Sequence, residues 1–91
     1  MKVNELYAII LDRKTNPKSG SYTNSLFDAG LPRIAQKVGE EGTEVVVAAL
    51  SQENERLIEE IADLTYHVLV LMVAKGVTPA DVAGELEKRH K

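Results

Sequence analysis

Residues 34–49 read IAQKVGEEGTEVVVAA, and the spacing of the apolar residues in this segment indicates its secondary structure. An α-helix turns by about 100° per residue, so residues three, four and seven apart share a face. At that spacing the apolar residues form one stripe, made of Ile34, Val38, Val45, Ala48 and Ala49. The three adjacent valines favour a strand, but they lie inside this longer helical pattern. The stretch therefore predicts a long amphipathic helix.

A carboxylate interrupts this apolar stripe. Glu41 falls within it, whereas Lys37 and Glu44 lie on its border. Glu40 lies further out, away from the core side. An ionised carboxylate on a core-facing stripe is costly unless another charge pairs with it. A divalent cation is one such partner for Glu41.

The following helix repeats the arrangement. Its expected core stripe consists of Leu57, Ile61, Leu64, Val68, Leu71 and Met72. Glu60, Asp63 and His67 lie together on one flank of that stripe. A short connection makes the two helices antiparallel neighbours. We therefore expect the acid pairs Glu41/Glu44 and Glu60/Asp63 to converge.

Carboxylates dominate this part of the chain. Residues 40–63 carry eight of the 14 acidic residues and a single basic one, although the net charge of the whole sequence is only −3. The sequence has no cysteine, which excludes disulfides and cysteine-ligated zinc. Four convergent carboxylates suit Mg²⁺ or Mn²⁺. The pattern predicts a magnesium-dependent phosphate hydrolase, with a solvated acidic helix face as the alternative.

The remaining segments predict further helices and no strand. The expected helices run over residues 3–13, 23–29, 32–51 and 54–74, with a last one beginning at Pro79. Thr23 and Thr78 are the expected caps, and Gly30 and Gly76 the expected stops. Residues 14–21 are read as an exposed, basic loop. The sequence thus predicts an all-α bundle of about four to five helices forming one domain over residues 1–91.

Composition limits the class and the location of the protein. Hydrophobic residues make up 44% and charged residues 27%, as in a folded globular domain. No apolar run approaches the roughly 18–20 residues that span a bilayer, and no apolar segment follows a basic start. We therefore expect a cytoplasmic protein without a membrane or nucleic-acid partner.

The acidic residues form a recognisable motif. Glu40, Glu41 and Glu44, followed by Glu60 and Asp63, reproduce the EExxE…ExxD pattern of the MazG-like all-α NTP pyrophosphohydrolases. The segments SYT at 21–23, IAQKVGEE at 34–41, ADLTYH at 62–67 and ELEKR at 85–89 resemble phosphoribosyl-ATP pyrophosphohydrolase. The similarity covers nearly the whole chain.

This resemblance implies an activity and a ligand set. The family hydrolyses phosphoribosyl-ATP to phosphoribosyl-AMP and pyrophosphate in histidine biosynthesis, with Mg²⁺. The residues that match its magnesium ligands are Glu41, Glu44, Glu60 and Asp63. Glu40 matches the first acid of the motif, and its expected role is on the attacking water or through a neighbouring group. The implied catalytic acids are Glu40, Glu41 and Glu44.

The resemblance also implies contacts to a small nucleotide substrate. Lys37 is the expected phosphate contact, with an i, i+4 ion pair to Glu41 as the alternative. Ser21, Tyr22 and Thr23 match the substrate-side loop and face either a phosphate or a ribose. For Thr23 a capping role explains the residue equally well. We do not count His67 as a ligand, because a core-edge histidine explains it as well.

The expected assembly is a homodimer or a larger homo-oligomer. The second half of the 54–74 helix is apolar all round, which indicates burial on more than one face. Larger forms in the pathway carry a fused cyclohydrolase, and this sequence resembles the stand-alone form. Two alternatives are open. One is a house-cleaning NTP pyrophosphohydrolase with the same carboxylates, and the other is a helical dimerisation module without catalysis.

Overall fold

The computed structural model describes residues 1–90, so Lys91, the last residue of the expected domain, lies outside it. Within that range the chain is all-helical. The five helices are α1 (Val3–Thr15), α2 (Tyr22–Ala29), α3 (Leu31–Ser51), α4 (Asn54–Lys75) and α5 (Pro79–Arg89). No strand occurs between residues 1 and 90. The all-α class and the number of helices expected from the sequence are confirmed.

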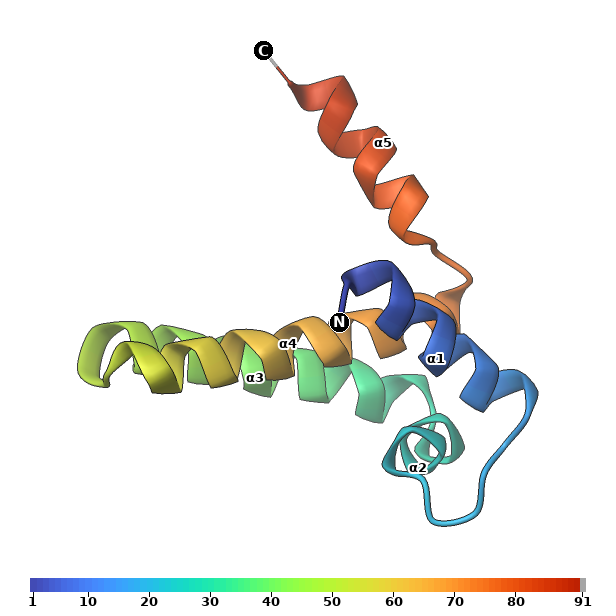
Figure 1. The fold of residues 1–91 in the computed structure, drawn as a ribbon. Helices are drawn as coiled ribbons and strands as arrows, with labels where there is room; N and C mark the ends of the chain where they lie inside the picture. The colour runs from blue at the N-terminus through green and yellow to red at the C-terminus, as the bar shows by residue number, and fades with distance from the viewer. Residues whose placement is uncertain (91) are drawn as a thin grey trace.

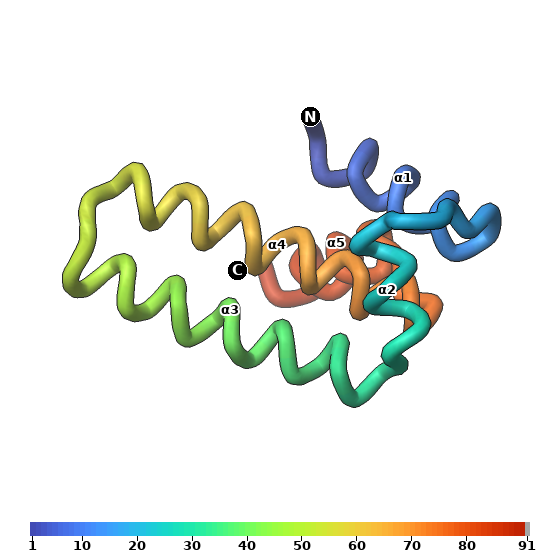
Figure 2. The backbone as a smooth tube through the Cα atoms, turned by 90° about the horizontal axis from the view of Figure 1, so that it is seen from below, coloured from blue at the N-terminus to red at the C-terminus, as the bar shows by residue number. Residues whose placement is uncertain are grey.

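Helices α3 and α4 form a long antiparallel hairpin. They lie side by side over most of their length in two perpendicular views (Figure 1 and Figure 2). The connection between them is short, with Gln52 and Glu53 as the residues that end α3 and precede α4. Helices α1 and α2 pack at the opposite end of the hairpin (Figure 2). Residues that flank the middle of the hairpin on both helices are therefore brought together.

Local signals explain most helix ends, with one correction. Thr78 caps α5 through a reciprocal capping box with Asp81. Gly76 ends α4 at φ 73°, a left-handed conformation that glycine adopts without steric cost. The prediction of Thr23 as the cap of α2 is wrong, because Ser21 accepts the hydrogen bond from the Asn24 backbone N–H. Helix α2 begins at Tyr22, so the residue that precedes it and caps it is Ser21 rather than Thr23.

The apolar core lies at the end of the hairpin where α1 and α2 pack. Its buried members are Ile10, Leu26, Ile34, Leu69, Val70 and Val73. Of the stripe expected on α3, Ile34 and Ala48 are buried and Val38 and Val45 half-buried, but Ala49 is exposed. The core therefore anchors one end of α3 and α4. Among residues 1–90, no third helix packs on the other half of the hairpin (Figure 2).

The prediction of which side of α4 faces the core is wrong. Val70 and Val73 are buried, although they lie opposite the stripe expected from Leu57 to Met72. Ile61, a member of that stripe, keeps 46% of its surface exposed. The cause is that α4 is apolar nearly all round in its second half, so periodicity alone cannot select a face. Packing by α1 and α2 selects the side that carries Val70.

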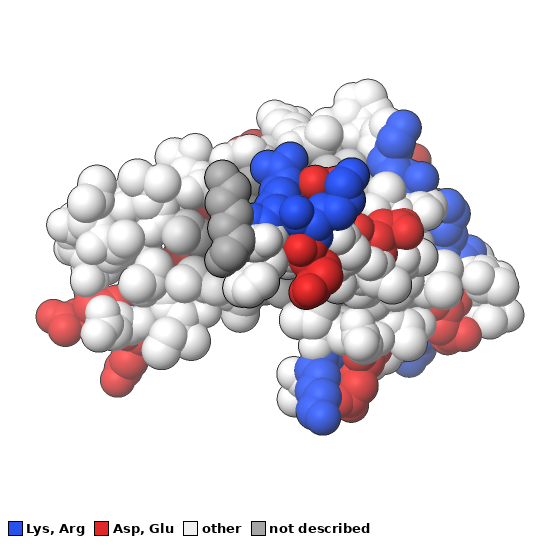
Figure 3. All heavy atoms as spheres, turned by 90° about the horizontal axis from the view of Figure 1, so that it is seen from above, with Lys and Arg blue, Asp and Glu red and all other residues white. Residues whose placement is uncertain are grey.

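Helix α5 leaves an apolar surface uncovered. It contacts α1 and projects away from the hairpin (Figure 1). A groove of about 380 Å³ lies between α4 and α5, and Leu64, Val68, Val82 and Leu86 are among its lining residues. Seen from the side to which α5 projects, the hairpin surface is almost free of charged side chains (Figure 3). Among residues 1–90, no helix combines the length and apolar character needed to cross a bilayer.

Candidate metal centre and substrate site

Four carboxylates converge at the middle of the α3–α4 hairpin. Glu41 and Glu44 come from α3, and Glu60 and Asp63 come from α4. One oxygen from each side chain lies within 4.8 Å of an oxygen from every other. The convergence expected from two acid pairs on neighbouring antiparallel helices is therefore present.

Two of these acids are buried with an unsatisfied oxygen. Glu41 is 4% exposed and Glu60 is 6% exposed. Within residues 1–90, the Oε2 atom of each is buried without a hydrogen-bond partner. Buried carboxylate oxygens nearly always have a partner, because an unpaired oxygen loses its hydration and gains no hydrogen bond or ion pair to offset that loss. Two such oxygens beside two exposed carboxylates fit a divalent cation with oxygen ligands.

A basic residue on the same helix pairs with each buried acid. Lys37 Nζ lies 3.1 Å from Glu41 Oε1, so the i, i+4 ion pair considered from the sequence does form. Arg56 donates to Glu60 Oε1 at 2.5 Å, also across four residues. In both cases the pair uses Oε1, and among residues 1–90 it leaves Oε2 without a hydrogen-bond partner. Sequence reasoning missed Arg56, although its i, i+4 spacing to Glu60 was visible.

The carboxylates perturb one another electrostatically. The adjacent carboxylates of Glu41 and Glu60 raise the pKa of Glu44 to about 7. Burial alone raises the pKa of Glu41, but the neighbouring Lys37 and Glu44 side chains outweigh it and lower that pKa overall. The hydrogen bond to Glu41 raises the pKa of Lys37. A proton shared in the cluster therefore resides on Glu44 rather than on Glu41.

Glu40 lies outside the four-carboxylate cluster. Its side chain is 45% exposed and forms ion pairs with Arg33 at 3.6 Å and with Lys37 at 3.8 Å. The expectation that it points away from the core is confirmed. Its link to the cluster runs through Lys37, which contacts Glu40 and Glu41 together.

Aromatic and hydroxyl side chains join α2 to α4 beside the cluster. Tyr22 Oη lies 3.0 Å from His67 Nε2. The Thr23 and Tyr66 hydroxyls form a second hydrogen bond, one residue after Tyr22 on α2 and one residue before His67 on α4. His67 is 3% exposed, so the interpretation of a satisfied histidine at the core edge is confirmed. Thr23, which does not cap α2, instead ties α2 to α4.

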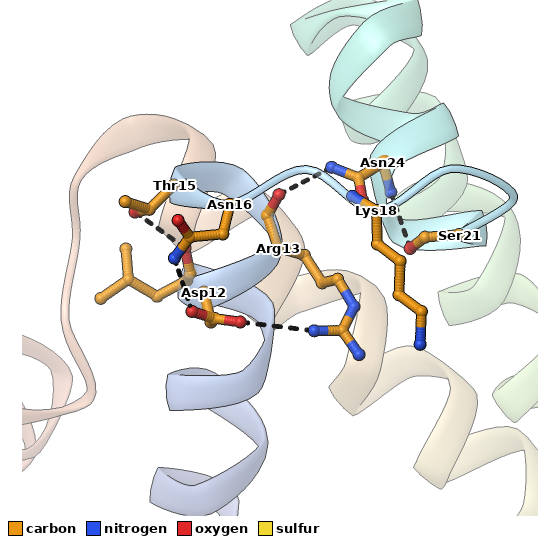
Figure 4. A network of polar contacts seen from close by, with 8 residues as sticks. Asp12, Arg13, Thr15, Asn16, Lys18, Ser21 and Asn24 are labelled. Atoms are coloured by element: carbon orange, nitrogen blue, oxygen red, sulfur yellow. Dashed lines mark hydrogen bonds and ion pairs between the residues drawn. The ribbon is translucent and has the colours of Figure 1, made fainter.

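The loop before α2 is ordered by one side chain that sequence reasoning missed. Asn24 Nδ2 donates to the Arg13 carbonyl at 2.7 Å, and its Oδ1 accepts from the Lys18 backbone N–H at 2.9 Å (Figure 4). The Lys18 side chain extends away from this network (Figure 4). A depression of about 640 Å³ lies over the loop, lined by residues 17–22, Asn24, Ser25 and Asp28. Ser21 and Tyr22 therefore face a cavity, and Tyr22 also contacts α4 next to the carboxylates.

Comparison with known proteins identifies the family. Residues 3–90 match the family described as phosphoribosyl-ATP pyrophosphohydrolase. The chain belongs to this family. Phosphoribosyl-ATP pyrophosphatases of Sulfurisphaera tokodaii and Saccharolobus solfataricus are 57% and 54% identical to it over 89 residues. Each match covers 98% of this chain and 95% of the relative.

A fused relative aligns with the same segment. The histidine biosynthesis bifunctional protein HisIE of Caldanaerobacter subterraneus subsp. tengcongensis is 48% identical over 98% of this chain and 43% of its own length. Membership of the phosphoribosyl-ATP pyrophosphohydrolase family confirms the resemblance inferred from the acid motif. It also agrees with the convergence of the motif's acids in the hairpin.

Proposed function

We propose that this protein hydrolyses phosphoribosyl-ATP to phosphoribosyl-AMP and pyrophosphate, the second step of L-histidine biosynthesis. Support comes from the family, whose description names this activity, and from relatives that carry the same name. The observation that carries the proposal is the pair of buried, unpartnered Oε2 atoms of Glu41 and Glu60 inside the carboxylate cluster. Such a site suits a reaction at a polyphosphate chain.

The proposed metal ligands are Glu41, Glu44, Glu60 and Asp63, and the proposed ion is Mg²⁺, with Mn²⁺ as a substitute. When bound, the ion supplies charge stabilisation for the phosphate oxygens and for the leaving pyrophosphate. The ion pairs with Lys37 and Arg56 hold the two buried carboxylates in fixed rotamers. Their free Oε2 atoms then remain directed toward the cluster.

The groups around the cluster have separate proposed roles. Lys37 is 19% exposed and binds a phosphate oxygen while it still contacts Glu41. Ser21, Tyr22 and Thr23 form the substrate side, next to the loop depression. Glu40 is assigned to the attacking water, either directly or through Lys37, because it is exposed and linked to the cluster by that residue. Glu40, Glu41 and Glu44 complete the proposed catalytic set.

The proposed active form is a homodimer, with a larger homo-oligomer as the alternative. The outer half of the hairpin exposes large apolar side chains, namely Val46, Val47, Leu50, Ile58 and Ile61. Fully burying one such side chain contributes about 1.5–3 kcal/mol. A chain of 91 residues buries little apolar surface by itself. Contact with a second copy covers this surface, and we include a single domain and a cytoplasmic location in the proposal.

Hydrolysis of phosphoribosyl-ATP by the purified protein tests the function. With Mg²⁺ we expect release of one pyrophosphate and formation of phosphoribosyl-AMP. Chromatography of the reaction mixture measures both products. Chelation with EDTA should abolish the reaction. Release of pyrophosphate from dNTPs, with phosphoribosyl-ATP left intact, would instead identify a house-cleaning NTP pyrophosphohydrolase. Absence of hydrolysis of either substrate, together with normal folding, would favour a dimerisation module.

A further inference from the structure

A buried histidine has no role in the proposed function. His67 lies on α4 one turn after Asp63 and is 3% exposed. Its ring meets the rings of Tyr22 and Tyr66 edge-on, with interplanar angles of 79° and 87°. The imidazole is therefore enclosed between aromatic side chains from α2 and α4.

The hydrogen bonds of His67 determine which ring nitrogen carries the proton. Nδ1 lies 2.8 Å from the carbonyl oxygen of Asp63. A carbonyl oxygen can only accept, so Nδ1 is the donor. In the neutral ring Nε2 is then an acceptor, and its partner at 3.0 Å is the Tyr22 hydroxyl. The Tyr22 hydroxyl therefore donates to His67.

Because its hydroxyl donates to His67, Tyr22 can only accept further hydrogen bonds. A phenol has one hydrogen, which the bond to His67 occupies, and its remaining lone pairs face other partners. A phosphate oxygen is itself an acceptor and gains nothing from these lone pairs, whereas a sugar hydroxyl can donate to them. Tyr22 is 52% exposed and lines the loop depression, where the Asp28 carboxylate offers further acceptors.

We propose that His67 is a positioning residue, which holds the Tyr22 hydroxyl so that its oxygen accepts a hydrogen bond from a ribose hydroxyl of the substrate. The inference rests on the proposed function. The sugar is the one that carries the triphosphate, because Tyr22 reaches α4 only one turn from Asp63. Phosphates contact Lys37 and the carboxylate cluster, and the adjoining ribose contacts Tyr22.

A double-mutant cycle tests the coupling of the two residues. His67→Asn retains a donor for the Asp63 carbonyl but loses the acceptor for Tyr22, and Tyr22→Phe removes only the hydroxyl. Each change should raise KM for phosphoribosyl-ATP by about tenfold, with kcat altered much less. The double variant should be no worse than either single one. Binding of phosphoribosyl-AMP, measured by calorimetry, should weaken in parallel.

Two further variants separate positioning from a structural effect. Tyr7→Phe removes another partly buried tyrosine hydrogen bond, from Tyr7 Oη to the Val77 carbonyl, far from the site. It should lower the melting temperature about as much as Tyr22→Phe while leaving KM unchanged. His67→Gln, whose Oε1 can accept in place of Nε2, should recover part of the loss in KM seen with His67→Asn.

The identity of the donor is tested with a modified substrate. The counterpart of phosphoribosyl-ATP made from 2′,3′-dideoxy-ATP lacks both hydroxyls of that ribose. For the wild-type protein, kcat/KM with this analogue should be about tenfold lower than with phosphoribosyl-ATP. For Tyr22→Phe and His67→Asn, the two substrates should give similar kcat/KM. Equal discrimination by Tyr22→Phe and wild type, or additive effects in the cycle, would overturn the inference. Hydrolysis by the wild-type protein is measured first, so failure of the proposed function is recognised separately.

Discussion

Glu41 is the residue whose charge and burial conflict most clearly. It occupies a position in a helical stripe where an apolar side chain would ordinarily pack, and it is buried with one oxygen unpaired. Lys37 compensates only the other oxygen. Retaining such a group costs stability in the metal-free protein. Removal of the charge, or binding of a cation by the unpaired oxygen, should therefore relieve this cost.

Substitution of the buried ligands should separate activity from folding. Glu41→Gln and Glu60→Gln keep the side-chain shape but remove a charge, so we expect activity to fall by more than about a hundredfold. The melting temperature in EDTA should change little, because each variant loses the ion pair with Lys37 or Arg56 together with a buried oxygen that lacks a partner among residues 1–90. Mg²⁺ should raise the melting temperature of the wild type but not of the variants. Glu59→Gln, on an exposed residue outside the cluster, is the control.

Retention of full activity by Glu41→Gln or Glu60→Gln would contradict the metal assignment. So would an equal stabilisation of variants and wild type by Mg²⁺ in thermal denaturation.

The raised pKa of Glu44 predicts proton release on metal binding. In the metal-free protein its pKa is about 7, so Glu44 carries a proton below that pH. A metal ligand must be ionised, and we therefore expect Mg²⁺ affinity to fall as the pH drops below about 7. Calorimetry in buffers of different ionisation enthalpy counts the released proton. Glu44→Gln should remove this component of the pH dependence.

The raised pKa of Glu44 also determines how the stability of the metal-free protein changes with pH. The pKa of Glu44 rises from 4.5 to about 7 on folding, so its protonated form is favoured in the native state. Its contribution to stability is present below pH 4.5 and is lost as the pH rises through about 7. Thermal denaturation in EDTA should show a lower melting temperature at pH 8 than at pH 6 from this group, and a smaller difference in Glu44→Gln. An unchanged difference would contradict the assignment.

Among the helices, α4 presents apolar side chains on two opposite faces, one of which packs in the core while the other is partly exposed. One face carries Val70 and Val73 into the core against α1 and α2, and the same side of the helix brings Glu60 and His67 inward. The other face carries Ile61, Leu64 and Val68 toward the surface and the groove beside α5. A helix that is apolar on both faces indicates a second packing partner.

Truncation on the two faces of α4 should therefore have different consequences. Val70→Ala removes two methyl groups from a fully buried position, so the free energy of unfolding should fall by about 2 kcal/mol at any protein concentration. Ile61→Ala acts on a side chain that is 46% exposed in the single chain. Its effect should appear at high protein concentration, where the dimer forms, and vanish on dilution. Chemical denaturation at several concentrations measures both.

For the whole molecule, the position of the core explains the need for assembly. The core lies where α1 and α2 meet the hairpin, and within the described residues 1–90 no third helix packs on the outer half of α3 and α4 (Figure 2). The carboxylate cluster lies between these two regions. Its rigidity therefore depends on packing at both ends of the hairpin, and the proposed dimer contact supplies the outer end.

Disruption of the proposed dimer contact should abolish assembly and weaken catalysis. Ile61→Glu places a charge on the exposed apolar face of α4, and we expect a shift from dimer to monomer in analytical ultracentrifugation with a parallel fall in kcat/KM. Leu31→Glu is the control, because Leu31 is similarly exposed at 41% but begins α3 at the end where α2 packs. A monomeric wild-type protein, or an unaltered dimer in Ile61→Glu, would contradict the proposed interface.

The helices, the hairpin and the four converging acids can all be predicted from the amino-acid sequence. These features depend on helical periodicity, caps and a short connection, which are local properties of the chain. Glu41 stands out because its position in the stripe conflicts with its charge, and that conflict can be detected without coordinates.

Three features depend on the folded arrangement: the buried face of α4, the cap of α2 by Ser21 rather than Thr23, and the pairing of Tyr22 with His67. The pairing of Tyr22 with His67 joins residues 45 positions apart, and the choice of face depends on where α1 and α2 pack. The cap depends on where the loop enters the helix, since α2 begins at Tyr22 and the Ser21 hydroxyl then accepts from the Asn24 N–H. Burial and partner choice are set by neighbouring elements in space, so no pattern within a single helix contains them.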